Sequence, residues 1–90
     1  MATHFNAHAE PAAILAYANE LRGADRIRRI LFALEVMIAG GADTRPFLAL
    51  FERADLVKIS RALLLPESDG HRYYRKGELA EHIVADITKH

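Results

Sequence analysis

The stretch from residue 24 to residue 41 constrains the fold most, because it can bury an apolar face only as a helix. Its apolar side chains recur at three- and four-residue spacing, which places them on one stripe of an α-helix. They are Ile27, Ile30, Leu31, Leu34, Met37 and Ile38. Asp25 is the expected N-cap, and Gly40 the expected left-handed residue that ends the helix. We therefore expect a central helix from about Arg26 to Ala39, with Leu34 in the core.

This central helix carries a second apolar face. Phe32 and Val36 lie four residues apart on the side opposite the main stripe, next to Arg29. A surface helix ordinarily has one apolar stripe, so the second face needs a further helix of the chain or a second copy. We predict a symmetric dimer through Phe32 and Val36 with Arg29 at the rim, because a chain of 90 residues without disulfides gains stability by burying this face.

Apolar periodicity predicts helices on both sides of the central one. Pro11 suits the first turn of a helix that Gly23 ends, and the short connection favours an antiparallel hairpin with the central helix. A last helix is expected from Lys76 to Lys89. Its inward residues would be Leu79, Ala80, Ile83 and Ile87, and its outward ones Glu78, Glu81, His82 and Ala85.

The region that follows Pro46 shows two apolar faces in succession. The first face consists of Phe47, Leu50, Phe51 and Ala54, and the second, rotated by roughly 150° at 100° per residue, of Leu56, Ile59 and Leu63. One straight helix cannot bury both faces in one core. We therefore expect a break near Ala54 and Asp55, with Asp55 as the new cap; the alternative is a continuous helix with two packing partners.

A turn is expected at residues 67–70, because Asp69-Gly70 supplies the positive φ angles that tight turns need. If Leu64 and Leu65 pair with residues 71–75, a small two-stranded wing results. The sequence thus predicts a single all-α domain over residues 1–90, a compact bundle of four to five short helices, with or without a β-hairpin near residues 64–75. Residues 1–9 have few apolar anchors and are expected to be frayed.

Composition narrows the classes of function. Twelve basic and twelve acidic residues give zero net charge, so only a local basic patch could attract nucleic acid. The absence of cysteine excludes disulfides and thiolate metal sites, and is compatible with a reducing cytoplasm. The sequence shows no signal peptide and no apolar run of about 18 residues, so we expect a cytoplasmic protein with no membrane partner.

No motif for catalysis is evident in the chain. It has no glycine-rich phosphate loop, nucleophile elbow or paired-carboxylate constellation, so we expect no enzyme, no catalytic residue, no cofactor and no metal. The first interpretation is a noncatalytic helical protein-interaction or regulatory module that acts as a homodimer.

The segment LLLPESDGHRYYRKGELAEHI supports an alternative. Its pattern rests on Leu64, Leu65, Pro66, Gly70, Arg72, Tyr73, Tyr74, Glu78, Leu79 and Ile83. Residues 64–83 resemble the wing and following helix of MerR-type DNA-binding domains, and FERADLVKISRALL is reminiscent of the helix-turn-helix that precedes such a wing. The resemblance implies a DNA-binding regulator with a helix-turn-helix at about residues 46–64 and a wing at about 64–75.

The contacts that this resemblance implies fall on two elements. Arg72 and Tyr73 or Tyr74 would lie near the phosphate backbone, and Lys58 and Arg61 on the reading helix. Arg75 and Lys76 complete the set of candidate nucleic-acid contacts. We expect these basic side chains to be exposed whichever function is right.

Overall fold

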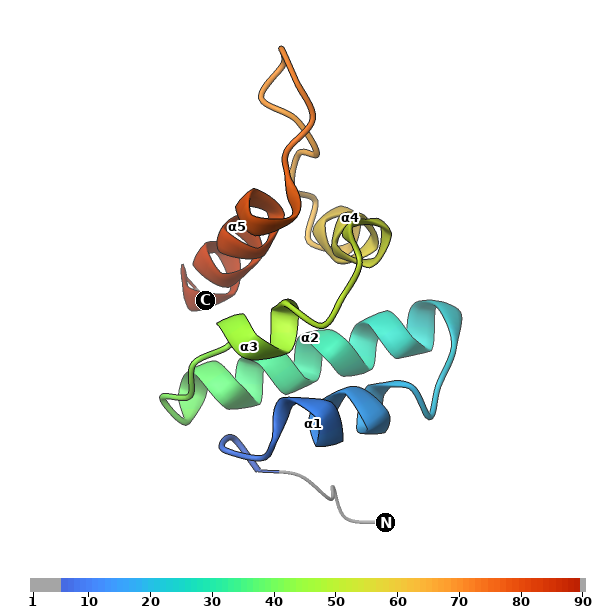
Figure 1. Ribbon diagram of the computed structural model, residues 1–90, viewed down its shortest axis with the longest axis vertical. Helices are drawn as coiled ribbons and strands as arrows, with labels where there is room; N and C mark the ends of the chain where they lie inside the picture. The colour runs from blue at the N-terminus through green and yellow to red at the C-terminus, as the bar shows by residue number, and fades with distance from the viewer. Residues whose placement is uncertain (1–5, 90) are drawn as a thin grey trace.

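The computed structural model describes residues 6–89, and five helices form the body of this part (Figure 1). They are α1 (Pro11–Ala18), α2 (Gly23–Ala39), α3 (Arg45–Leu48), α4 (Arg53–Ala62) and α5 (Lys76–Lys89). The all-α prediction is confirmed: residues 6–89 contain no strand, and their β pairing is one isolated antiparallel bridge between Ser68 and Tyr73. Residues 1–5, where the expected frayed segment starts, lie outside the described residues.

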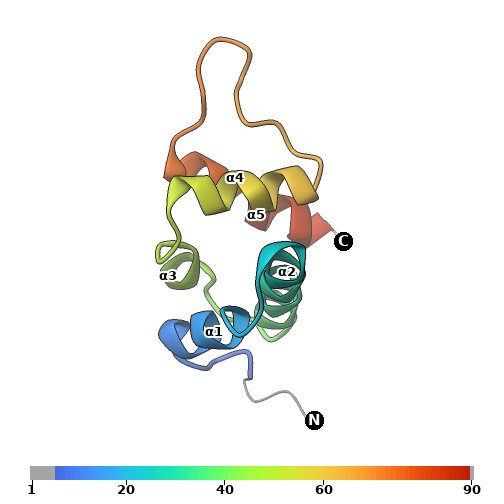
Figure 2. The same ribbon diagram turned by 90° about the vertical axis from the view of Figure 1, so that its right-hand side faces the viewer.

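The helices form two packed pairs. α1 and α2 run antiparallel side by side, as predicted, and α4 and α5 pack on each other at the other end of the body (Figures 1 and 2). α2 also contacts α4 and α5, and α3 contacts α1. Every other long helix thus packs against α2, which makes it the central element expected from its length and its stripe. No helix within residues 6–89 is both long and apolar enough to cross a membrane.

The core forms where these helices meet. α2 contributes four buried side chains, and Leu34 is fully buried, as predicted. Ile27, Leu31 and Ile38 are partly buried and pack against the core. The buried apolar residues of the five helices are Ile14, Ala18, Ile30, Ala33, Leu34, Met37, Phe47, Leu48, Leu56, Val57, Ile59, Leu79, Ile83 and Ile87.

The caps of α2 differ from the prediction at both ends, although the helix ends at Ala39 as expected. The helix begins at Gly23, so Asp25 lies in its first turn and pairs with Arg28 at 2.7 Å instead of capping. At the other end Gly40 is helical in φ, and Gly41 has φ of 75°. Gly41 N–H donates to Ile38 O and Ala42 N–H to Met37 O, which is a Schellman motif. In that motif the left-handed residue follows the C-cap, so the prediction was one residue early.

The predicted break exists, but it lies at residues 49–52, before Ala54 and Asp55. Glu52 precedes α4, and Asp55 lies inside the helix, where it pairs with Arg26 at 3.2 Å. Phe47 and Phe51 are both buried, and their rings pack edge to face with centroids 5.1 Å apart. The chain turns tightly here, since Leu50 N–H donates to Phe47 O and Phe51 N–H to Leu48 O. Because α3 ends before this turn, Leu50 is 46% exposed and does not share the buried face expected of it.

A hairpin of residues 63–75 connects α4 to α5 and projects beyond the helices (Figures 1 and 2). The amides of Leu64 and Leu65 donate back to α4, to Arg61 O and Ser60 O, so they cannot pair across the hairpin as expected. Pairing starts later, where Tyr74 N–H donates to Glu67 O at 2.9 Å. The tip is the predicted turn, with Gly70 at φ 95°.

Candidate nucleic-acid interface

The outward side of α4 consists of small and basic residues. Its exposed residues are Arg53, Ala54, Lys58, Arg61 and Ala62. The last four fall within about 100° of the helical wheel, so they form one narrow face. The single carboxylate of α4 belongs to Asp55, which is partly buried and paired with Arg26. The face therefore carries positive charge without an acidic residue of its own helix.

The legs of the hairpin stand at the two ends of α4 (Figure 2). At the C-terminal end, Arg61 binds Glu67 through two hydrogen bonds, from Nε to Oε2 at 2.8 Å and from Nη2 to Oε1 at 3.1 Å. At the N-terminal end, Arg53 Nε donates to Tyr74 O at 2.9 Å, and its guanidinium lies 5.8 Å from the Tyr73 ring centroid. Both legs are thus tied to α4, and the hairpin and the outward face of α4 belong to one surface.

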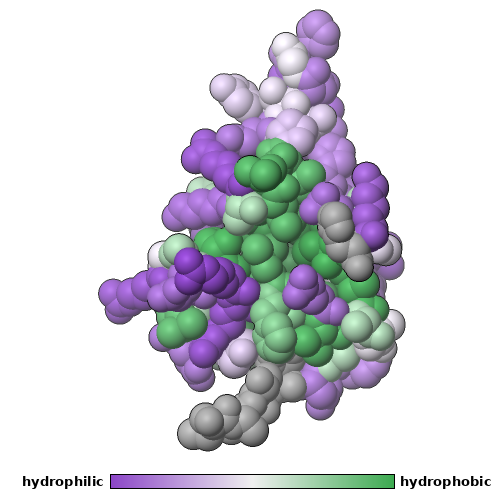
Figure 3. Space-filling view, turned by 180° about the vertical axis from the view of Figure 1, so that it is seen from behind, coloured by the Kyte–Doolittle hydropathy of each residue, from purple (hydrophilic) through white to green (hydrophobic). Residues whose placement is uncertain are grey.

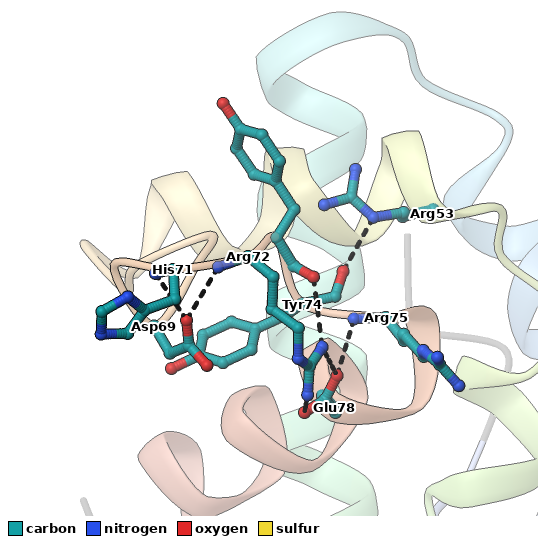
Figure 4. A network of polar contacts seen from close by, with 8 residues as sticks. Arg53, Asp69, His71, Arg72, Tyr74, Arg75 and Glu78 are labelled. Atoms are coloured by element: carbon teal, nitrogen blue, oxygen red, sulfur yellow. Dashed lines mark hydrogen bonds and ion pairs between the residues drawn. The ribbon is translucent and has the colours of Figure 1, made fainter.

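A second arginine–glutamate pair joined by two hydrogen bonds, an arrangement called a fork below, fixes the returning leg of the hairpin to the start of α5 (Figure 4). Arg72 Nη1 and Nη2 donate to the two carboxylate oxygens of Glu78, both at 2.8 Å. The Arg75 backbone N–H donates to the same carboxylate at 2.9 Å, which satisfies one free amide at the helix N-terminus. The Arg72 guanidinium, followed by this amide, lowers the pKa of Glu78 from 4.5 to about 2. The Arg75 side chain points away from the fork (Figure 4).

All six predicted nucleic-acid contacts are exposed: Lys58, Arg61, Arg72, Tyr73, Arg75 and Lys76. Two of the cations are held by carboxylates, in the Arg61–Glu67 and Arg72–Glu78 pairs. Lys76 Nζ donates to Ala49 O at 2.8 Å.

The other two cations, Lys58 and Arg75, have no ion-pair partner for their side chains among the described residues. From residue 52 to residue 78 the chain has six basic and five acidic residues, so the surface is almost neutral overall. Any affinity for an anion must therefore come from local groups.

The resemblance did not decide whether Tyr73 or Tyr74 is the candidate phosphate contact, and the two side chains differ in exposure. Tyr73 is 72% exposed, whereas Tyr74 is partly buried and packs edge-on against His82, with ring centroids 4.6 Å apart. His82, expected to face outward, is instead partly buried, and its Nδ1 is buried without a hydrogen-bond partner. Tyr74 thus anchors the hairpin to α5, and Tyr73 is the tyrosine that a ligand can reach.

Sequence reasoning missed Arg53 as part of this surface. The predicted break near Ala54 and Asp55 placed Arg53 at the end of the preceding helix, far from the wing. In the structure α4 begins at Arg53, which therefore lies beside the returning leg of the hairpin. No local sequence signal distinguishes the two placements, because Phe47 and Phe51 share a buried face in either one.

The residues of the predicted dimer contact lie on the opposite part of the molecule. Arg29 binds α1, through hydrogen bonds to Tyr17 O at 3.0 Å and Glu20 Oε1 at 2.8 Å, and covers the Tyr17 ring. Phe32 is 44% exposed, and Val36 is partly buried. α1 therefore occupies the side of α2 where Arg29 was expected to form a rim, and the dimer contact stays a prediction.

A separate groove of about 870 Å³ runs between α5 and the segment that contains the end of α2 and α3. The α5 side is lined mainly by small or apolar residues, which include Gly77, Ala80, Val84, Ala85 and Thr88. Seen from behind, apolar side chains gather over the helical body, whereas the projecting hairpin is hydrophilic (Figure 3). The groove and the hairpin are thus chemically different surfaces.

No group of three or more histidine, aspartate or glutamate side chains within residues 6–89 could hold a metal ion. No protein-family model, curated protein or solved structure matches this chain.

Proposed function

We propose that this chain binds duplex DNA through the outward face of α4 and the hairpin of residues 63–75. The observation that carries the proposal is the set of exposed side chains on α4, all of them small or basic, beside a projecting hairpin that presents Arg72, Tyr73 and Arg75. A helix enters the major groove, which is about 12 Å wide, and small side chains allow a close approach to the bases. The resemblance of residues 64–83 to a MerR-type wing also supports it.

The side chains divide into two roles. Lys58 and Arg75 have no ion-pair partner among the described residues, so they can meet phosphates without breaking an existing contact. Tyr73 can donate its hydroxyl to a phosphate oxygen. Ala54 and Ala62 flank Lys58 on the helical wheel and leave room for the DNA. A surface of this kind reads mainly the backbone, with few contacts to bases.

Titration of a random-sequence duplex at 50 and 200 mM salt tests the proposal. Binding through three or four phosphates should give a slope of about −2.7 to −3.6 in a plot of log K against log salt. Lys58→Ala should make the slope shallower by about 0.9, because one phosphate contact is lost. Lys89→Ala, which removes one exposed cation from the far end of α5, is the matched control and should leave the slope unchanged.

Two outcomes would contradict DNA binding. One is the absence of binding by the wild type at 50 mM salt, where phosphate contacts are strong. The other is an equal effect of Lys58→Ala and Lys89→Ala, since this would show dependence on total charge without a localised surface.

The second candidate is a homodimeric protein-interaction module, and the groove beside α5 favours it. Its volume of about 870 Å³ and its small and apolar lining suit an apolar partner surface. Sedimentation of the wild type tests the dimer directly, and a monomer at all accessible concentrations would end the proposal. Ala85→Glu in the groove and Phe32→Glu on α2 add charge at exposed positions, so the variant that dissociates the dimer identifies its surface.

A further inference from the structure

We infer that Glu67 and Glu78 are internal competitors for the phosphates, so that tight binding of DNA requires Arg61 and Arg72 to exchange a carboxylate for a phosphate. This inference rests on the proposed function and adds a control mechanism to it. Without the exchange, the surface offers nucleic acid few unpaired cations. With it, two guanidiniums become available, one at each leg of the hairpin.

The geometry of the two forks carries the inference. Each arginine presents two N–H groups to two carboxylate oxygens, at 2.8 and 3.1 Å in the Arg61–Glu67 pair and at 2.8 Å twice in the Arg72–Glu78 pair. A phosphate accepts the same two-pronged contact from arginine, so a carboxylate and a phosphate cannot occupy one guanidinium face together. The glutamates thus hold the place that two phosphates would take.

Both forks are also open to exchange. The side chains of Arg61 and Arg72 are 65% and 53% exposed, so a phosphate can approach from solvent. An exposed ion pair is weak and holds its partner by a factor of only about two to five, which a polyanion can overcome. The competitors differ in one respect, since Glu78 also accepts the Arg75 amide. We therefore expect the Glu67 fork to open more readily.

The test compares Glu67→Gln, Glu78→Gln and the double variant with the wild type on a random duplex, at 50, 100 and 200 mM salt. Glutamine keeps one acceptor oxygen for the arginine or the amide but removes the competing charge. Glu20→Gln is the matched control, because it breaks the Arg29–Glu20 pair at 2.8 Å and changes net charge equally, on the α1 side of the molecule. Circular dichroism and the Tyr74 and His82 ring resonances report whether the hairpin keeps its place.

Each single variant should bind about two to five times more tightly than the wild type, because its arginine no longer has to give up a carboxylate. The salt slope should stay the same, because both proteins contact the same phosphates in the complex. The double variant should show roughly the product of the two factors, because the forks share no residue. Glu20→Gln should change neither the affinity nor the slope beyond a small uniform effect.

The possible failures of the two proposals differ. If the wild type binds DNA and depends on Lys58, but Glu67→Gln and Glu78→Gln act like Glu20→Gln, internal competition is refuted and DNA binding stands. If neither the wild type nor any variant binds at 50 mM salt, both proposals fall. If the variants bind more tightly but the ring resonances of Tyr74 and His82 are lost, the gain comes from a displaced hairpin and the inference is refuted.

Discussion

Leu64 occupies a backbone position where glycine is favoured, and Leu64→Gly should stabilise the protein. α4 ends in a Schellman motif in which Leu64 N–H donates to Arg61 O at 3.0 Å and Leu65 N–H to Ser60 O at 2.8 Å. This motif gives Leu64 a φ of 60°, the single positive φ of a non-glycine residue within residues 6–89. The equivalent position at the end of α2 is Gly41, with φ of 75°. The chain thus contains the same motif twice, with leucine at the left-handed position in one copy and glycine in the other.

The magnitude follows from two opposing contributions. A left-handed conformation costs an L-residue about 1–2 kcal/mol, and Leu64→Gly removes that cost. Glycine loses more conformational entropy on folding, which subtracts about 0.5–1 kcal/mol. The side chain is 92% exposed, so its removal sacrifices almost no apolar burial. The free energy of unfolding should rise by about 0.5–1 kcal/mol, and Tm by about 2–8 °C for a domain of this size.

Thermal and urea unfolding followed by circular dichroism measure the effect. Leu64→Ala is the first control and should stay within about 0.5 kcal/mol of the wild type, because alanine keeps the β-carbon that causes the strain. Gly41→Ala is the second, with the opposite sign: a β-carbon there meets no atom within 4 Å, so the expected loss of about 1 kcal/mol comes from the backbone alone.

Two results would refute this reasoning. A lower Tm for Leu64→Gly would show that the leucine side chain makes contacts worth more than the strain. An equal rise for Leu64→Ala and Leu64→Gly would place the cost in the exposed side chain, with no contribution from the backbone conformation.

Three further predictions follow from buried and paired groups. Leu34→Ala should lower the free energy of unfolding by about 2–5 kcal/mol, and a Tm within a degree or two of the wild type would contradict its place in the core. Ser60→Ala should raise this free energy by about 1 kcal/mol, because the Ser60 hydroxyl is fully buried without a hydrogen-bond partner; a loss in urea unfolding would mean that the hydroxyl has one. The pKa of Glu78 lies at about 2 in the fold and at 4.5 as the reference for the unfolded chain, so its stabilising contribution is present above pH 4.5 and disappears as the pH falls toward 2. Glu78→Gln should therefore lose less stability than the wild type between these pH values, and parallel urea-midpoint curves would contradict this.

The sequence alone was sufficient to predict which residues face the core in helices that carry a regular apolar stripe. In α2, spacing placed Ile30, Leu34 and Met37 in the core, and in α5 it placed Leu79 and Ile83 there. Such patterns are readable because the period of the helix alone decides which side chains share a face. The turn at Asp69-Gly70 was readable for a similar reason, since its φ requirement acts within a few residues.

The sequence did not determine where α2 and α4 begin, although the expected bounds of α5 and the expected last residue of α2 are correct. At the break before α4, Leu50 N–H donates to Phe47 O and Phe51 N–H to Leu48 O, which tightens the chain into a turn. The hairpin pairing starts late because the amides of Leu64 and Leu65 already donate to carbonyls of α4. In both places, alternative carbonyl groups compete for the same backbone amides. Local propensity gives both alternatives a similar free energy, so packing decides between them.

The candidate interface depended most on tertiary structure. The sequence supplied Lys58, Arg61, Arg72 and Tyr73 as exposed side chains, but it could not show that Arg53 lies beside the hairpin or that carboxylates hold two of the arginines. The charge of a residue is a local property, whereas the partner of that charge depends on where the chain turns back. At this surface the hairpin brings Glu67 to Arg61 and Glu78 to Arg72, and only the fold decides which cations remain available to a ligand.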